Sequence, residues 1–208
     1  MVPQRFRQFR ACESENKPTP KYGSVSIGGK TYKTVKIGKQ EWLAENLDLK
    51  TDLSYTNPSH PKYGRYYEWN ALKEVQAALP SGWRVPDNKD WNELMHSVGG
   101  TKVAGMALKS TEFGGDDEYG FSVLPAGYRN GDGDYLSAGY YAYFWSSSEY
   151  SSIGAYYRDF YYYDGYVSHS IGSKGNGFSV RCVRDSRETD EPNDEGNQHT
   201  RPRIRLIK

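Results

Sequence analysis

The chain has 208 residues, of which 36% are hydrophobic and 25% are charged, so it is long enough for one domain with its own apolar core. Its formal net charge of +1 creates no overall field that would attract an anionic polymer, and we expect no nucleic-acid partner. No segment approaches the roughly 20 apolar residues that a membrane helix needs, so we also expect no transmembrane segment.

Both ends are polar and contain proline, and neither could bury enough apolar surface to fold alone. We therefore divide the chain into a polar leader (1–22), a folded domain (23–185) and a polar, basic tail (186–208). No export signal is visible in the leader, because it lacks an apolar stretch of signal-peptide length. Its Cys12 is either an exposed, unmodified thiol or a lipid-modified residue. The absence of an apolar stretch before Cys12 favours the unmodified thiol. The tail either docks to an assembly partner through its final RPRIRLIK segment or has no fixed structure.

The first predicted elements are strands, followed by two helices. Residues 25–47 alternate apolar and polar side chains around Gly28-Gly29 and Gly38-Lys39, which predicts an antiparallel meander with tight turns and with Trp42 and Leu43 in the core. Helical spacing of apolar residues predicts one helix over 68–79 and another after Pro86, with Asp87 as its N-cap.

From residue 114 onward, glycine, serine and tyrosine predominate, which is typical of short strands separated by polar loops. We expect strands within GFSVLPAGY (120–128), AYFWSSSE (142–149) and GFSVRCVRD (177–185). The apolar surroundings of Cys182 indicate a buried, unreactive thiol.

Six motifs occur in the order TYKTVKIGKQEWLAENL, YGRYYEWNAL, LPSGWRVPDNKDWNEL, GFSVLPAGYR, YFWSSSEY and GFSVRCVRD. Through them the chain resembles the Fibrobacter major paralogous domain family over roughly residues 22–185. The resemblance implies an α+β, C-type-lectin-like fold of the formylglycine-generating-enzyme type. In that fold two helices pack on a twisted antiparallel sheet, and a loop-rich β half presents a binding surface.

Some relatives resemble the variable proteins of diversity-generating retroelements, in which adenines of asparagine codons are replaced. Every residue from Tyr157 to Ser173 can be reached from AAC or AAT in this way, whereas Lys, Glu, Gln, Met and Trp, which cannot be reached, are absent from this range. This pattern predicts a hypervariable face at about 157–175.

Asp164-Gly165 lies between strand-like flanks and predicts a two-residue hairpin turn with positive φ at both positions. That turn would pair Tyr163 with Tyr166. We expect one face of the hairpin to bind and the other, with Phe160, Tyr162 and Val167, to contact the scaffold; a one-residue slip would exchange the faces. The candidate ligand-binding residues are Tyr157, Asp159, Tyr161, Tyr163, Asp164, Gly165, Tyr166, Ser168, His169, Ser170, Ile171, Gly172, Ser173 and Gly175.

Tyrosine with serine, glycine and aspartate is typical of binding loops, because tyrosine offers a rigid surface with a polar tip. We therefore expect a surface-displayed protein, on a phage virion tip or a bacterial cell, that recognises a protein or glycan receptor. One alternative is a cell-surface adhesin or carbohydrate-binding module of fixed specificity. Another is a tyrosine-rich ribbon that merely covers the sheet.

An enzyme is a third hypothesis and would use the carboxylates of 116–118 and 130–134, which could also hold a cation. Glycine and aspartate are also the residues that commonly form turns. We favour the interpretation that these two segments are solvated turns. His60, His96 and His169 lack zinc-ligand spacing, and Ser146-Ser147-Ser148 lacks the glycines of a nucleophile elbow. We expect no catalytic residue, no metal site and no cofactor.

Overall fold

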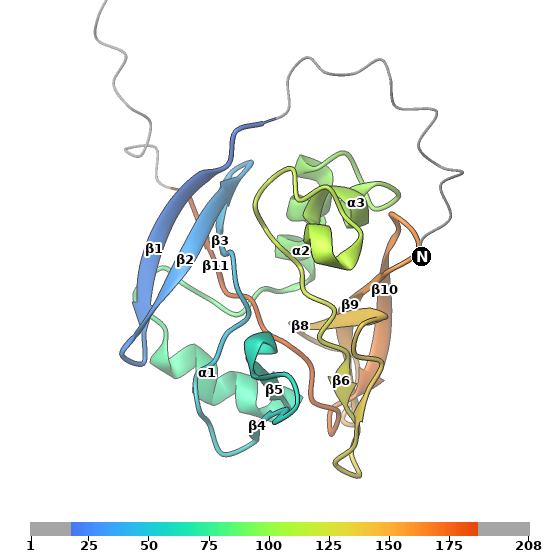
Figure 1. Ribbon diagram of the computed structural model, residues 1–208. Coiled ribbons are helices and arrows are strands. Elements are labelled where there is room, and N and C mark those ends of the chain that lie inside the picture. The colour runs from blue at the N-terminus through green and yellow to red at the C-terminus, as the bar shows by residue number, and fades with distance from the viewer. Residues whose placement is uncertain (1–17, 187–208) are drawn as a thin grey trace, which may run out of the picture.

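Within residues 18–186, which the computed structural model describes, the chain combines small antiparallel sheets with short helices (Figure 1). The strands are β1 (Lys21–Ile27), β2 (Lys30–Ile37), β3 (Gln40–Leu43), β4 (Ser54–Thr56), β5 (Arg65–Tyr67), β6 (Tyr128–Arg129), β7 (Tyr135–Leu136), β8 (Tyr141–Glu149), β9 (Gly154–Tyr161), β10 (Val167–Ser173) and β11 (Val183–Asp185). The α-helices are α1 (Leu72–Ala78), α2 (Asn88–Ser97) and α3 (Ala104–Leu108), and the 3₁₀-helices are η2 (Pro61–Tyr63), η3 (Trp69–Ala71) and η4 (Thr111–Phe113).

The predicted meander is confirmed as part of a four-stranded sheet with the order β1-β2-β3-β11. Two-residue turns join its first three strands, and Gly28, Gly29 and Gly38 adopt the positive φ that these turns require. Trp42 and Leu43 are fully buried, as expected. β1 begins at Lys21, inside the segment that we expected to form the leader.

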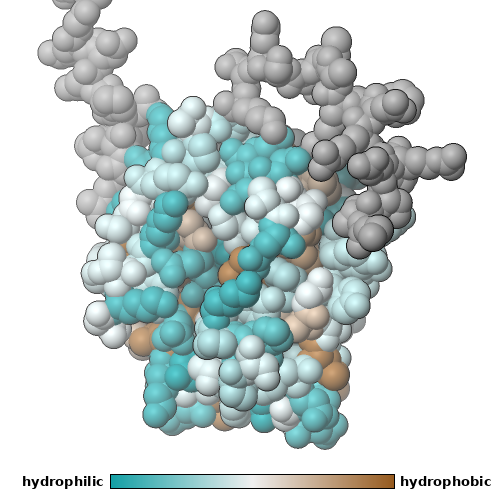
Figure 2. Space-filling model, in the orientation of Figure 1, coloured by the Kyte–Doolittle hydropathy of each residue, from teal (hydrophilic) through white to brown (hydrophobic). Residues whose placement is uncertain are grey.

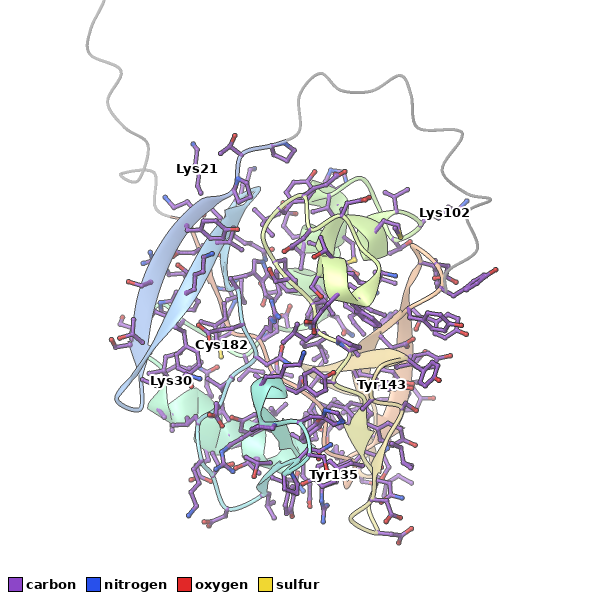
Figure 3. All side chains as sticks on the ribbon, viewed as in Figure 1. Lys21, Lys30, Lys102, Tyr135, Tyr143 and Cys182 are labelled. Atoms are coloured by element: carbon purple, nitrogen blue, oxygen red, sulfur yellow. The ribbon has the colours of Figure 1, made fainter. Side chains whose placement is uncertain are left out.

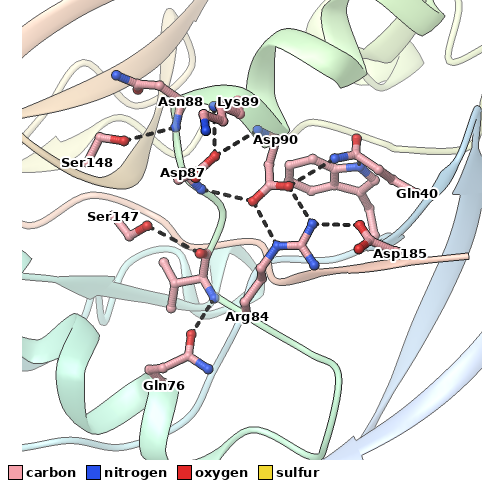
Figure 4. Close-up of polar contacts among 12 residues, drawn as sticks. Gln40, Gln76, Arg84, Asp87, Asn88, Lys89, Asp90, Ser147, Ser148 and Asp185 are labelled. Carbon is pink, nitrogen blue, oxygen red and sulfur yellow. Dashed lines mark hydrogen bonds and ion pairs between the residues drawn. The ribbon is translucent and has the colours of Figure 1, made fainter.

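The second predicted helix, α2, is held at its N-terminus by the expected cap. The Asp87 carboxylate accepts from the amides of Lys89 and Asp90, and the Asp90 carboxylate accepts in return from the Asp87 amide (3.1 Å). Asp90 also accepts from the guanidinium of Arg84 and from Gln40 Nε2 (3.1 Å) (Figure 4). This network therefore connects the start of α2 to β3 of the four-stranded sheet.

Other predicted elements differ from the structure. The predicted helix at 68–79 begins as the 3₁₀ turn η3 and continues as α1, and a third α-helix, α3, was not predicted. Most of GFSVLPAGY and the first six residues of GFSVRCVRD lie outside continuous strands and are connected to their neighbours by isolated β-bridges. These segments pass between sheets and bond to a different neighbour every few residues.

Three clusters of buried hydrophobic residues fill the interior of residues 18–186, and two of them are large. The first lies between the four-stranded sheet and the three-stranded sheet β10-β9-β8, with α2 and α3 between them (Figure 1). It includes Val35, Trp42, Trp91, Leu94, Leu108, Phe144, Phe160 and Val167. The second, around α1, includes Tyr32, Leu72, Val75, Trp145, Phe178 and Cys182. The two sheets are thus fixed to one scaffold, and the three-stranded sheet can hold a site rigidly.

Cys182 lies in the interior (Figure 3), and burial raises the pKa of its thiol well above the usual range. The prediction of a buried thiol is confirmed. None of the helices in 18–186 combines the length and the apolar character needed to cross a membrane. Cys12 and the C-terminal RPRIRLIK segment lie outside the described residues.

Candidate functional site

The tyrosine-rich segment forms the hairpin β9–β10, but the predicted turn is wrong. Phe160 pairs with Val167 and Asp159 with Ser168, so the register is shifted by two residues from the predicted one. The connection is the five-residue segment 162–166. Because the shift is even, each strand residue keeps the face predicted for it.

The hairpin tip, residues 162–166, forms this longer connection because α3 and Lys109, the residue after α3, bond to its backbone. Lys109 is fully buried, and its Nζ donates to the carbonyl oxygens of Tyr161 (2.8 Å), Tyr162 (3.1 Å) and Asp164 (2.8 Å). Neither Asp164 nor Gly165 has the positive φ of the predicted turn. The bonds to the ammonium group therefore override the local preference of Asp-Gly.

Further backbone bonds fix the tip on both sides. The amide of Gly105 in α3 donates to the carbonyl of Gly165 (2.8 Å), and the amide of Val167 donates to the carbonyl of Thr101 (2.9 Å). A Cβ at Gly105 would lie only 2.8 Å from the Gly165 oxygen, so this approach needs a glycine. All of these contacts use main-chain atoms of the tip, which leaves its tyrosine side chains free to project, whereas the Asp164 carboxylate accepts from the amide of Tyr166 (3.0 Å).

Four tyrosines around the connection are solvent-exposed, and we call them the tyrosine tip. They are Tyr140 (59% exposed), Tyr162 (41%), Tyr163 (73%) and Tyr166 (51%). Three of the rings contact one another: Tyr140 meets Tyr162 edge to face with ring centroids 5.5 Å apart, and Tyr162 meets Tyr163 at 5.8 Å. Tyr162 is thus a surface residue, which corrects its assignment to the scaffold side; Phe160 and Val167 are buried as predicted.

A second group of tyrosines continues from the tip along one face of the three-stranded sheet. Tyr141 stacks on Tyr161 (ring centroids 4.7 Å apart) and on Tyr143 (5.6 Å), and Tyr143 contacts Tyr157 (5.7 Å). We call these four residues the tyrosine ladder; all are half-buried. Figure 3 labels Tyr143 on this sheet. Because the rings pack against one another, the ladder offers a preformed surface.

Asp159 places a carboxylate within the ladder. It lies opposite Tyr143 on β8 and accepts a short hydrogen bond from the hydroxyl of Ser168 on β10. Partial burial raises the pKa of Asp159, as does the nearby charge of Asp164, although the bond from Ser168 opposes the shift. Burial and the Asp159 charge also raise the pKa values of Tyr143 and Tyr157, so both hydroxyls remain neutral donors near neutral pH.

This shift predicts a pH-dependent gain in stability for Asp159→Asn. The raised pKa means that the folded chain holds a proton at pH values where the unfolded chain has lost it, so ionisation costs stability as pH rises through that window. We expect the variant to gain up to about 1 kcal/mol at about pH 7 and nothing at about pH 3, measured by urea unfolding. The exposed Asp132→Asn is the control, and a gain that is equal at both pH values would contradict the prediction.

The predicted site residues divide among three places. Tyr157, Asp159, Tyr161, Ser168, Ser170 and Gly172 lie on the ladder face, and Tyr163, Asp164, Gly165 and Tyr166 lie in the tip. His169, Ile171 and Ser173 point to the opposite face and are exposed, while Gly175 follows the end of β10. The predicted site is therefore a ribbon with two usable faces, not one continuous patch.

The carboxylate-rich loops show the bonding expected of turns. Asp117 accepts from both the amide (2.7 Å) and the hydroxyl (2.6 Å) of Ser122, and the Asn130 side chain accepts from the amides of Asp132 and Asp134. Within 18–186 no group of three or more His, Cys, Asp or Glu side chains is placed to hold a metal ion. The three serines at 146–148 bond to nearby main-chain atoms of the chain, among them the amide of Asn88.

The predicted site lacks Lys109, Tyr140, Tyr141 and Tyr143, and Tyr162 was predicted to contact the scaffold. Tyr141 and Tyr143 could have been found, because the alternation in YAYFW places Tyr141, Tyr143 and Trp145 on one face of a strand. Lys109 carries no local signal, since nothing near it in the sequence shows that its ammonium group meets carbonyls more than 50 residues away.

Comparison with known proteins decides the family. The sequence profile of the Fibrobacter succinogenes major domain matches residues 35–184. This range includes the three-stranded sheet, all three α-helices and β3, together with parts of β2 and β11, but not β1. The chain belongs to this family. No curated protein and no solved structure matches it. Within the Fibrobacter succinogenes major domain, the tyrosine ladder, the tip and Lys109 all fall inside the matched region.

Proposed function

We propose that this member of the family is a ligand-binding protein, and that its tyrosine tip and ladder recognise a protein or glycan receptor on another cell or particle. The supporting observation is the tip itself: exposed tyrosines project from a backbone that Lys109 and Gly105 hold in place. A rigid backbone with amphipathic rings loses little conformational entropy on binding. The surface seen in Figure 2 is mostly hydrophilic or near neutral, with apolar residues in small, separate areas.

We further propose that a diversity-generating retroelement varies this surface. The restricted residue set of 157–173 supports this, and the main-chain anchoring of the tip means that its tyrosine side chains could be exchanged without loss of its conformation. Arg158, Phe160 and Val167 are buried, so substitutions there would disturb the core. Variation is therefore expected at 161–166 and at the exposed residues of β10.

We also propose that the chain has a C-type-lectin-like scaffold and is displayed on a virion tip or a bacterial surface. The mixed helix and sheet arrangement and the irregular second half of the chain are compatible with that scaffold. Binding here means shape and hydrogen-bond complementarity, with tyrosine rings as anchors and no reaction.

One observation favours fixed specificity as the second candidate. Tyr141 and Tyr143 belong to β8, outside the restricted segment, and they stack with Tyr161 in a set of rings that pack against one another. A cluster of half-buried tyrosines that does not vary suits recognition of one fixed ligand, such as the sugar bound by an adhesin or carbohydrate-binding module.

The binding test uses a glycan array and intact cells of neighbouring species, probed with labelled full-length chain. We expect the triple variant Tyr162→Ser, Tyr163→Ser, Tyr166→Ser to lose at least about tenfold in affinity, because it removes three exposed aromatic anchors. Its free energy of unfolding should change by less than about 1 kcal/mol, since the tip is held by main-chain bonds.

Tyr150→Ser is the matched control, because Tyr150 is similarly exposed (58%) but lies outside the tip and ladder. If the triple variant still binds, or if Tyr150→Ser reduces binding equally, the tyrosine tip does not bind the receptor. Deep sequencing of the region encoding 150–185 in a natural population separates the two candidates. Substitutions concentrated at codons for exposed residues support diversification, and uniform variation supports a fixed ligand.

A further inference from the structure

The three-stranded sheet has two edges, and residues 18–186 cover only one of them along its length. At the β8 edge, the amide of Gly127 donates to the carbonyl of Tyr141 (2.7 Å) and the amide of Ser179 to the carbonyl of Tyr143 (3.0 Å). The amide of Trp145 donates in turn to Ser179 (3.2 Å). This edge is therefore bonded like an interior strand.

The other edge is β10, and two bonds show which of its groups face outward. The amide of Val167 points away from β9 to the carbonyl of Thr101, whereas the amide of Lys174 points to the β9 side, where it donates to the residue just before that strand (3.0 Å). Because successive residues of a strand alternate direction, the amide and carbonyl groups of His169 and Ile171 point outward.

Within 18–186 no main-chain group bonds to these outward groups of His169 and Ile171. Proteins usually protect such an edge with lysine, proline, a bulge or a covering loop. From Val167 to Ser173 the strand has no lysine, arginine, carboxylate or proline, and its pairing with β9 is regular. The side chains of His169, Ile171 and Ser173 are also exposed. Among the described residues no other strand pairs with this edge of β10, so the edge can accept a further strand.

We infer that a second copy of this chain pairs with β10 in antiparallel orientation, with Ser170 on the two-fold axis. In this register, His169 lies opposite Ile171 of the second copy, and each such pair exchanges two hydrogen bonds between its outward groups. Self-pairing of most edge strands would bring like charges together; the uncharged β10 avoids this cost. The side chain of Ile171, 45% exposed in one copy, becomes covered by His169 of the other.

The two-fold axis of such a pair is perpendicular to the sheet, so both tyrosine ladders face the same side of one continuous six-stranded sheet. A receptor array on a cell or particle could then be bound by both copies at once, with a gain in avidity. This consequence rests on the proposed function, whereas the dimer does not.

Sedimentation of the full-length chain over a range of concentrations tests the dimer in the absence of any ligand. We expect a monomer–dimer equilibrium, and we expect Ile171→Lys to raise its dissociation constant about tenfold or more, because two lysines would then flank the two-fold axis. Leu136→Lys is the matched control: Leu136 is 40% exposed and lies on β7, away from this edge, so the equilibrium should not change.

Cross-linking tests the register. In a Cys12→Ser background, Ser170→Cys should form a covalent dimer on mild oxidation, because residues at a non-hydrogen-bonded antiparallel pair have Cα atoms about 4.5 Å apart, within disulfide range. Ser168→Cys should not, since that residue lies opposite Gly172 of the second copy. The remaining cysteine, Cys182, is buried.

A monomer at every concentration would overturn the inference, as would a dimer that Ile171→Lys leaves intact. Protection of the His169 and Ile171 amides from hydrogen exchange in a monomer would assign this edge to another part of the same chain. A dimer that binds no receptor would leave the inference standing and count against the proposed function alone.

Discussion

Lys109→Met is expected to lower the free energy of unfolding by about 2–4 kcal/mol, because it leaves three carbonyl oxygens of the hairpin tip without their donor. Methionine matches the length and shape of the lysine stem, so packing changes little. Removal of a buried charge offsets part of the loss. Because Lys109 bonds to the hairpin tip, the effect should be greatest there. The amides of Gly105 and Val167, which bond across the tip, should exchange faster with solvent.

The comparison variant is Lys102→Met, which replaces an exposed lysine just before α3 (labelled in Figure 3). Its unfolding free energy should stay within about 0.5 kcal/mol of the original chain. Urea unfolding gives both values. If the two variants behave alike, Lys109 does not organise the tip, and the main support for a rigid binding surface is lost.

Arg181→Met should destabilise the chain by about 3–5 kcal/mol. The guanidinium is fully buried and donates to the side chain of Asn46 (3.0 Å) and to the carbonyls of Phe121 and Ser122, the latter at 2.8 Å. Its planar group also lies over the ring of Phe121 (4.5 Å). Burial lowers the pKa of the guanidinium, yet the group remains charged at neutral pH, so its loss leaves several buried acceptors unpaired.

Arg129→Met provides the contrast, because Arg129 is partly exposed and stacks on the ring of Tyr55 (3.8 Å) at the surface. A loss below about 1 kcal/mol is expected for it. Thermal and urea unfolding of both variants measure the difference. A small effect at Arg181 would mean that water or neighbouring donors replace its bonds. It would contradict the inference that Arg181 stabilises the fold by connecting Asn46 to Phe121 and Ser122.

Local patterns were sufficient wherever a residue's partners lie close in the chain. The meander β1–β3 was predicted because Gly28-Gly29 and Gly38-Lys39 form turns that depend on a few adjacent residues. The N-cap of α2 was predicted because Asp87 bonds to amides two and three residues later. Buried Phe160 and Val167 were predicted by alternation along a strand.

Local patterns failed wherever distant partners decide the outcome. Asp164-Gly165 favours a two-residue turn in isolation, but three bonds from Lys109 and one from Gly105 stabilise a longer connection. The isolated bridges of 177–179 have the same origin, since their partners lie on β6, β5 and β8. The ladder was found only in part, because its rings come from strands that meet through tertiary pairing.

The sequence by itself therefore determined the family, the order of the main elements and the choice of the tyrosine segment as the candidate site. These depend on composition and on spacing along the chain. Tertiary structure alone decided which tyrosines share a face, how the tip is held and which strand edge stays open. Those features depend on Lys109, on β8 and on the β9–β10 register, and bonds between residues far apart in sequence outweigh local turn preference when they are buried and several act together.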